Sequence, residues 1–158
     1  RAFDAGKGER VPTFAEVLEL AKTHNVKLLP ELKSAHFYPG IEEKILLALE
    51  QADYLDQSVM QSFEADTLDQ LHRLEPRANL CALYGLWQFN VSRPAGNARY
   101  VCPMAEMVLL NPGMIRQAHR QGRQVFIWFG VTENPFMVRV MRFFGADGLI
   151  VNDPLALK

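Results

Sequence analysis

Residues 124–152 read QVFIWFGVTENPFMVRVMRFFGADGLIVN and contain the pattern that decides the fold. Gln124 to Phe129 form an apolar run of strand length, which is typical of a strand buried on both faces. Pro135 to Phe144 predict a helix, and Gly148 to Asn152 predict a second strand. Two buried strands joined by a helix predict a parallel pair with a helical crossover.

The same alternation extends toward the start of the chain. Thr13 and Glu16 have the spacing of a capping box, and the apolar residues after them repeat at helical intervals, which predicts a helix to about His24. The remaining predicted elements are strands at residues 26–33, 57–61, 79–84 and 99–102 and helices at residues 41–51, 64–74 and 112–121. Six strands are therefore predicted, and Pro30 inside the first of them removes one backbone donor.

Six strands with helical crossovers place the chain in the α/β class and leave two architectures open. An eight-stranded (β/α)8 barrel of the TIM type typically needs about 250 residues, whereas the chain has 158. The pattern fits either an open doubly wound sheet or a TIM-type barrel with about six of its eight strand–helix units. Residues 1–10 are polar and indicate a connecting segment, and 1–158 is predicted to be a single domain.

Composition and charge exclude several functional classes. The chain has 17 Lys and Arg against 18 Asp and Glu, and this balance is not typical of a protein that binds nucleic acid or an anionic membrane. No apolar stretch approaches the roughly 20 residues that span a bilayer, so no transmembrane segment is expected. No charged start followed by an apolar run precedes the first predicted helix, so no signal peptide is expected either. Cys81 and Cys102 fit neither a metal site nor a dense disulfide framework, and both are predicted to be small buried hydrophobic residues.

The candidate functional motif is Pro30-Glu31-Leu32-Lys33, which lies at the end of a predicted strand. Because side chains alternate along a strand, Glu31 and Lys33 are expected on one side and Leu32 on the other. Parallel α/β folds place their chemistry at the carboxyl ends of strands. The spacing alone fits two interpretations: a functional pair at the mouth of a barrel, or an ion pair on the surface.

Several short motifs follow one another along the chain: VPTFAEVL at 11–18, ELK at 31–33, QSF at 61–63, Trp128, GADGLI at 145–150 and NDP at 152–154. In this order they resemble the glycerophosphodiester phosphodiesterase family. Each motif is weak by itself, but their order and spacing make the combination specific. The resemblance covers nearly the whole chain, corresponds to the later part of the family domain without its first two barrel strands, and implies the TIM-type alternative.

The resemblance also implies a function and roles for individual residues. Members of the family hydrolyse a small-molecule glycerophosphodiester to glycerol 3-phosphate and an alcohol with the help of a divalent cation, calcium or magnesium. By this resemblance Glu31 is a metal ligand, Lys33 contacts the phosphate, and Trp128 forms an apolar wall of the substrate site. These roles agree with the preference of hard cations for oxygen ligands and with the stabilisation of charge on phosphoryl oxygens.

No catalytic residue is assigned within this chain, because the two catalytic histidines of the family would lie upstream of Arg1. His24, His72 and His119 fall within or at the ends of predicted helices, and His36 lies in a loop beside the predicted mouth. The chain by itself is therefore expected to show little or no hydrolysis.

The chain departs from the family pattern at two places. It reads WFGVTEN at 128–134 where the family commonly has Trp-Thr-Val-Asn, so the loop is about two residues longer. It also reads NDP at 152–154 where the family ends with Thr-Asp-x-Pro. We expect the longer loop to shape a different substrate pocket.

Two other functions remain open at this point. The first is a non-catalytic truncated barrel that covers its open sheet edges by forming a homo-oligomer or by binding a partner chain. The second is a related phospholipase-type phosphodiesterase that acts on lipid head groups. The sequence does not determine the compartment, although a cytoplasmic location is favoured over a periplasmic or secreted one.

Overall fold

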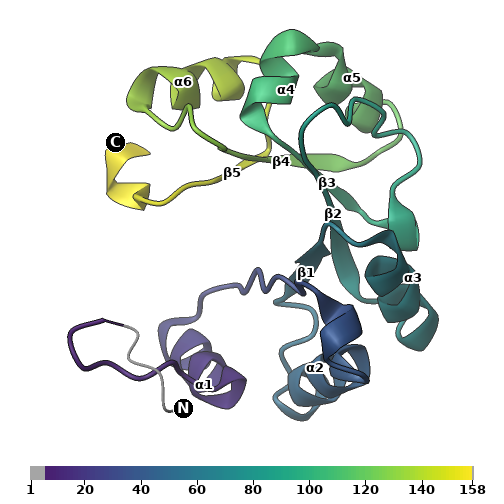
Figure 1. Ribbon diagram of the computed structural model, residues 1–158, viewed down its shortest axis with the longest axis vertical. Helices are drawn as coiled ribbons and strands as arrows, with labels where there is room; N and C mark the ends of the chain where they lie inside the picture. The colour runs from purple at the N-terminus through teal and green to yellow at the C-terminus, as the bar shows by residue number, and fades with distance from the viewer. Residues whose placement is uncertain (1–5, 158) are drawn as a thin grey trace.

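The computed structural model describes residues 6–157 as five parallel β-strands and six α-helices. The strands curl into an incomplete barrel, and the helices cover its outer side (Figure 1). The strands are β1 (Val59–Ser62), β2 (Asn79–Tyr84), β3 (Tyr100–Pro103), β4 (Gln124–Trp128) and β5 (Gly148–Ile150). The helices are α1 (Phe14–His24), α2 (Ile41–Gln51), α3 (Ala65–Leu74), α4 (Ala105–Leu110), α5 (Gly113–His119) and α6 (Pro135–Phe143). Short 3-10 turns lie at Ala35–Phe37, Ala95–Asn97 and Pro154–Leu157.

The order of the strands decides between the two predicted architectures. The strands neighbour one another in chain order, β1-β2-β3-β4-β5, and every neighbouring pair is parallel. An open doubly wound sheet would instead reverse its strand order at a switch point. Sequential order combined with a curled sheet is the arrangement of a β/α barrel, and the five strands form an arc of such a barrel (Figure 1).

The two faces of the sheet bury different side chains. The outer face packs against the helices in two clusters, one with α1, α2 and α3 and the other with α4, α5 and α6. The concave face has a smaller cluster whose members all come from the strands or from the segment before β1. These members are Leu29, Val59, Cys81, Leu83, Tyr100, Cys102, Phe126 and Trp128. Their spacing of two along each strand is the spacing of side chains that share one face of a sheet.

Capping contacts explain where two of the predicted helices begin. The hydroxyl of Thr13 accepts a hydrogen bond from the Glu16 N–H at 3.3 Å, and the Glu16 carboxylate accepts one from the Thr13 N–H at 2.6 Å. At α6, the side-chain oxygen of Asn134 accepts from the Met137 N–H at 3.0 Å, and Pro135 occupies the first turn. These contacts satisfy backbone donors that a helix leaves unpaired at its N-terminus.

The helices of the described residues are short. The longest, α1 and α2, have 11 residues each, and no helix in residues 6–157 is long and apolar enough to cross a membrane. Helix α4 was not predicted from the sequence, because six residues are too few to display a helical repeat. It buries Met107 and Val108 in the outer core and carries Glu106 near the end of β4.

The prediction of six strands is corrected to five. The segment before β1 pairs with it through two isolated bridges, Leu28 with Ser58 and Glu31 with Gln61. Pro30 between them has no N–H to donate, although its carbonyl accepts from the Gln61 N–H at 2.9 Å. The missing donor interrupts the ladder, so this segment lies beside β1 without regular strand pairing.

The two cysteines are buried, as predicted, but they are not free thiols. Cys81 in β2 and Cys102 in β3 are joined by a disulfide bond, with their Cα atoms 6.2 Å apart. Cys102 lies in register with Leu83, two residues beyond Cys81, so both cysteines share the concave face of neighbouring strands. Strand pairing brings together two residues that lie 21 positions apart in the chain.

Candidate functional site

The mouth of the arc, at the carboxyl ends of the strands, carries Glu31, Lys33, Gln61, Phe63 and Trp128. Glu31 lies in register with Gln61 of β1, and both Glu31 and Lys33 are exposed. Leu32 between them is buried in the outer core with α1 and α2. The burial of these three consecutive residues therefore follows the alternation expected from the sequence.

A set of hydrogen bonds holds the backbone on either side of Lys33. The Ser62 hydroxyl donates to the Leu32 carbonyl at 2.7 Å and accepts from the Glu64 N–H at 3.1 Å. The Glu64 carboxylate in turn accepts from the N–H groups of Ser34, at 2.8 Å, and Ala35, at 3.2 Å. The end of β1 and the start of α3 thus position the turn that follows Lys33.

Gln61 is a buried polar residue of the mouth. Its side chain is 7% exposed, and its Oε1 atom has no hydrogen-bond donor among the described residues. Gln61 lies between Glu31 on one side and Cys81 on the other in the parallel register. Its position in the strand alternates with Met60 and Ser62, so its side chain belongs to the concave face.

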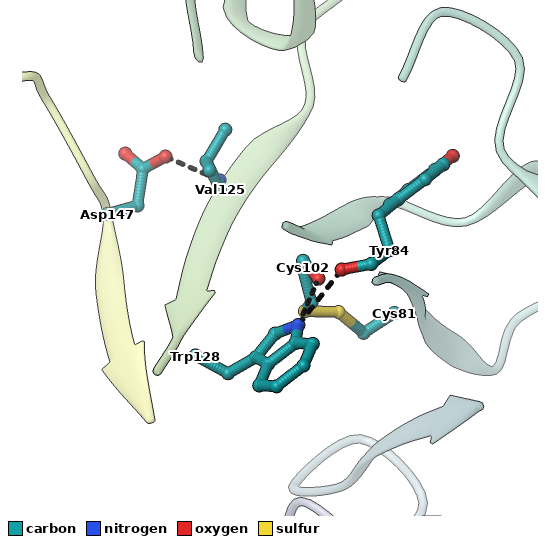
Figure 2. The surroundings of a disulfide bond; sticks show 6 residues. All are labelled: Cys81, Tyr84, Cys102, Val125, Trp128 and Asp147. Atoms are coloured by element: carbon teal, nitrogen blue, oxygen red, sulfur yellow. Dashed lines mark hydrogen bonds between the residues drawn. A yellow bond between two sulfur atoms is a disulfide. The ribbon is translucent and has the colours of Figure 1, made fainter. Parts of the chain in front are cut away.

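The indole of Trp128 is fixed across the ends of β2 and β3. Its Nε1–H donates to the Tyr84 carbonyl and to the Cys102 carbonyl, each at 3.1 Å, next to the disulfide bond (Figure 2). The ring of Phe63 meets it edge to face, with centroids 5.6 Å apart. Because its polar atom is already bonded to the protein, Trp128 presents an apolar ring rather than a hydrogen-bond donor.

The loop after β4 is attached to α4 through Glu106. The carboxylate accepts from the N–H groups of Gly130 at 3.2 Å, Val131 at 2.8 Å and Thr132 at 2.9 Å, and from the Thr132 hydroxyl at 2.9 Å. Burial raises the pKa of Glu106, but the hydrogen bonds from Val131, Thr132 and Gly130 outweigh it and lower the pKa below its ordinary value. The longer loop noted in the sequence is therefore an ordered structure beside Trp128.

A second anchor joins the same loop to the end of β5. The Glu133 carboxylate accepts from the backbone N–H of Asn152 at 2.8 Å and from its side-chain amide at 2.6 Å. Asn152 occupies the position at which the family commonly has a threonine. The residue that departs from the family pattern is therefore the one that donates to Glu133. The two anchors hold both ends of the loop near the mouth.

A pocket of about 610 Å³ lies beside the mouth, between α3 and the loop that follows β2. Its lining includes Phe63, Tyr84, Trp87, Phe89 and Arg93. Trp87 is 75% exposed and is not among the site residues predicted from the sequence. A lone aromatic residue in a loop carries no periodic signal, so only its position in the fold reveals that it faces this pocket.

The histidines lie apart from Glu31 and Lys33 or on exposed loop surface. His119 lies 2.9 Å from the Asp147 carboxylate at the amino ends of the strands, where Asp147 also accepts from the Val125 N–H at 2.7 Å (Figure 2). His36 is exposed, 3.9 Å from Glu64. His24 ends α1 and His72 lies within α3.

Within residues 6–157, the mouth offers few oxygen donors for a divalent cation. Among the described residues there is no group of three or more His, Cys, Asp and Glu that could hold a metal ion. Calcium takes six to eight oxygen ligands and magnesium takes six. The Glu31 carboxylate and the neighbouring Gln61 amide are fewer donors than either ion requires, so residues 6–157 do not form a complete cation site.

The curled parallel sheet with charged and aromatic side chains at the carboxyl ends of its strands defines a protein of the β/α-barrel class. The chain belongs to the glycerophosphoryl diester phosphodiesterase family, whose model matches residues 2–156. The match covers the segment from the first predicted helix to the end of β5, in agreement with the resemblance found in the sequence.

Individual relatives agree with this assignment. The chain is 28% identical over 156 residues to a glycerophosphodiester phosphodiesterase of Caldanaerobacter subterraneus subsp. tengcongensis, which covers 95% of this chain and 61% of that protein. A crystal structure from Galdieria sulphuraria superimposes with a TM-score of 0.85, and that of a glycerophosphodiester phosphodiesterase from Parabacteroides distasonis with a TM-score of 0.78. The sequence identities to this chain are 21% for the first structure and 18% for the second. The first superposition covers 99% of this chain and 66% of the Galdieria chain. The second covers 91% of this chain and 61% of the Parabacteroides chain. The chain thus spans about three fifths of the length of its curated relative.

Proposed function

We propose that this chain belongs to an enzyme that hydrolyses a glycerophosphodiester to glycerol 3-phosphate and an alcohol with a divalent cation. The observation that carries the proposal is the family match over residues 2–156. It is supported by the exposure of Glu31 and Lys33 on the segment that pairs with β1. The relative from Caldanaerobacter carries the name of this activity.

In this proposal Lys33 binds the phosphate. Its ammonium group is exposed at the mouth, and it follows the buried Leu32, whose carbonyl is held by Ser62. A lysine in this position attracts and orients the anionic diester and stabilises charge on its oxygens. Trp128 forms the apolar wall of the site, because its ring is fixed by two backbone carbonyls.

Glu31 contributes one oxygen ligand to the cation, calcium or magnesium. The cation would supply charge stabilisation for the phosphoryl oxygens. The described residues supply too few donors, so the other ligands of this proposal come from outside residues 6–157.

We further propose that the 158-residue chain by itself is inactive as a hydrolase. General acid–base catalysis needs a proton donor or acceptor within hydrogen-bond reach of the reacting atoms. Among the described histidines, His119 is engaged with Asp147 at the opposite end of the strands, and His36 lies against Glu64. Full hydrolysis of glycerophosphodiesters by the isolated chain would contradict this part of the proposal.

Binding of glycerol 3-phosphate tests the site without requiring turnover. Trp128 fluorescence, recorded in a Trp87→Phe background in the presence of calcium, reports the titration. We expect Lys33→Met to weaken binding at least about tenfold, since a charged hydrogen bond is lost. Lys27→Met is the matched control, because Lys27 is an exposed lysine at the amino end of the same segment. Equal affinities for the two variants would refute the role of Lys33.

The open edges of the arc favour a second arrangement in which another copy of the chain covers them. Among the described strands, β5 has a neighbour on one side only, and the bridged segment at Leu28 and Glu31 forms the other edge. Exposed strand edges are commonly covered in proteins. Sedimentation at several concentrations tests this, and a monomer at all concentrations would count against a homo-oligomer.

A further inference from the structure

Two loops at the carboxyl ends of the strands expose large apolar side chains to solvent. Leu86 and Trp87, which follow β2, are 61% and 75% exposed, and Val131, which follows β4, is 90% exposed. We call these three residues the apolar rim. Single exposed apolar residues are common on protein surfaces, whereas several that lie together mark a surface of interaction.

The first turn of α4 brings the two loops together. The Trp87 N–H donates to the sulfur of Met107 at 3.1 Å, and the Val131 N–H donates to the carboxylate of Glu106 at 2.8 Å. Glu106 and Met107 are consecutive residues of α4. Because each loop is bonded to one of these two neighbours, Trp87 and Val131 lie on the same part of the surface, although two strands separate them in the chain.

An ordered backbone holds the rim outward. Trp87 has φ +62°, in the left-handed region that bulky residues rarely adopt. Its loop is anchored by Val91, which is fully buried in the outer core, and by the side chain of Gln88, which accepts from the Gly85 N–H at 2.7 Å. A bulky ring kept exposed at a cost in backbone energy is typical of a functional surface.

The charges around the rim decide which kind of lipid surface fits it. The loop residues 85–94 and 129–134 contain one cation, Arg93, and one carboxylate, Glu133. Glu106 beneath Val131 adds a second negative charge. Anionic lipid surfaces attract clusters of lysine and arginine, and these two loops carry no such cluster. A layer of zwitterionic head groups has no net charge, and tryptophan is enriched at the boundary between such a layer and the acyl chains.

The area of the rim argues against a second copy of the chain as its partner. A protein–protein interface of standard size buries about 800 Å² on each partner. A large aromatic side chain supplies about 150–250 Å², and leucine and valine supply less. Three side chains are therefore too few for a stable dimer, whereas insertion of a few apolar residues is sufficient for reversible attachment to lipid.

We propose that the apolar rim docks the protein onto a surface of zwitterionic lipids, with Leu86, Trp87 and Val131 inserted among the head groups. This inference goes beyond the proposed function, because docking requires neither the cation nor hydrolysis. Both loops leave the carboxyl ends of the strands, so attachment through the rim turns the mouth toward the lipid layer.

Sedimentation of the full chain with phosphatidylcholine vesicles, without calcium, measures its partition between water and lipid. Trp87→Asn removes the ring, and asparagine tolerates a positive φ, so this variant should unfold at the same temperature as the unsubstituted chain or higher. Val131→Ser removes the aliphatic side chain of the second loop. The matched controls are Phe143→Asn, at the end of α6, and Val26→Ser, after α1. Their side chains are 86% and 50% exposed outside the rim.

We expect the unsubstituted chain to sediment with the vesicles, Trp87→Asn to reduce the partition about tenfold and Val131→Ser to reduce it roughly threefold. The two controls should bind as the unsubstituted chain does. Tryptophan emission should shift to shorter wavelength when vesicles are added, and the shift should be absent from Trp87→Asn, which retains Trp128. Higher salt, or replacement of half the lipid by phosphatidylglycerol, should not strengthen binding.

Four results would overturn the inference. The first is an unsubstituted chain that does not sediment with phosphatidylcholine vesicles. The second is an equal loss of binding in the control and rim variants, which would show adsorption without a defined surface. The third is binding that requires phosphatidylglycerol and disappears in salt. The fourth is a dimer without lipid that Trp87→Asn dissociates, together with no vesicle binding, which would assign the rim to a second copy. The glycerol 3-phosphate titration tests the proposed function independently of all four.

Discussion

Substitution of Glu106 by Gln should loosen the loop between β4 and α6 and lower the stability of the fold. The carboxylate accepts four hydrogen bonds from this loop, and the two from Thr132 are partly buried. A bond to a charged acceptor contributes about 1 kcal/mol more than a bond to a neutral one. The two partly buried bonds therefore account for about 2 kcal/mol, and the exposed ones for little.

The glutamine variant also loses the contact at Gly130. The amide group that replaces the second carboxylate oxygen carries hydrogens and faces another N–H donor. For a chain of this length, about 2 kcal/mol corresponds to a decrease in unfolding temperature of roughly 4–8 °C. Circular dichroism during thermal and urea unfolding at pH 7 measures this loss, with Glu19→Gln on the exposed face of α1 as the control.

The difference in stability between the unsubstituted chain and Glu106→Gln should become smaller as the pH is lowered. The pKa of Glu106 is lowered in the folded protein from its ordinary value of 4.5, so the unfolded chain takes up the proton at a higher pH than the folded protein. The contribution of the carboxylate is therefore complete above about pH 4.5 and is lost as the pH falls through the folded pKa. Equal stability of Glu106→Gln and the control at pH 7, or a difference unchanged in acid, would refute this reasoning.

Two further predictions concern a buried glycine and the disulfide bond. Gly96→Ala should destabilise the fold by more than about 3 kcal/mol, because Gly96 has φ +60° and an added Cβ would lie 2.5 Å from the Leu68 carbonyl oxygen. Gly122→Ala, with φ +69° and nothing within 4 Å, should lose only about 1 kcal/mol in urea unfolding, and equal losses would contradict the steric argument. Reduction of the Cys81–Cys102 bond should cost about 3 kcal/mol for a 21-residue separation. Thermal unfolding with and without reductant, with the thiols counted, tests this, and an unchanged unfolding temperature would contradict it.

Local signals in the sequence predicted most of the elements. The helix α2 and the strand β2 have the predicted bounds, and α1 begins at the predicted capping box. These predictions succeed because capping and side-chain periodicity depend on residues within one or two turns. The same signals failed at α4, which is too short to show a period, and at Pro30, which stops regular pairing of an otherwise strand-like segment.

The candidate site was predictable only in part. Strand alternation predicted that Glu31 and Lys33 would lie on one side of the segment and Leu32 on the other, and Leu32 is indeed the buried residue of the three. The resemblance to the family indicated Glu31, Lys33 and Trp128 as site residues. The resemblance did not indicate how Trp128 is held. Its indole nitrogen binds the carbonyls of Tyr84 and Cys102, which lie 44 and 26 residues away in the chain.

The sequence by itself determined the alternation of strands and helices and the class of the fold. It also determined that Glu31 and Lys33 lie on the side of their segment opposite to Leu32. Each of these properties depends on residues that are close together in the chain. The tertiary structure alone decided the sequential strand order, the disulfide bond between Cys81 and Cys102, and the position of Gln61 beside Glu31. These features arise from the register between strands that lie some 20 to 30 residues apart, and no local pattern specifies which residues that register brings into contact.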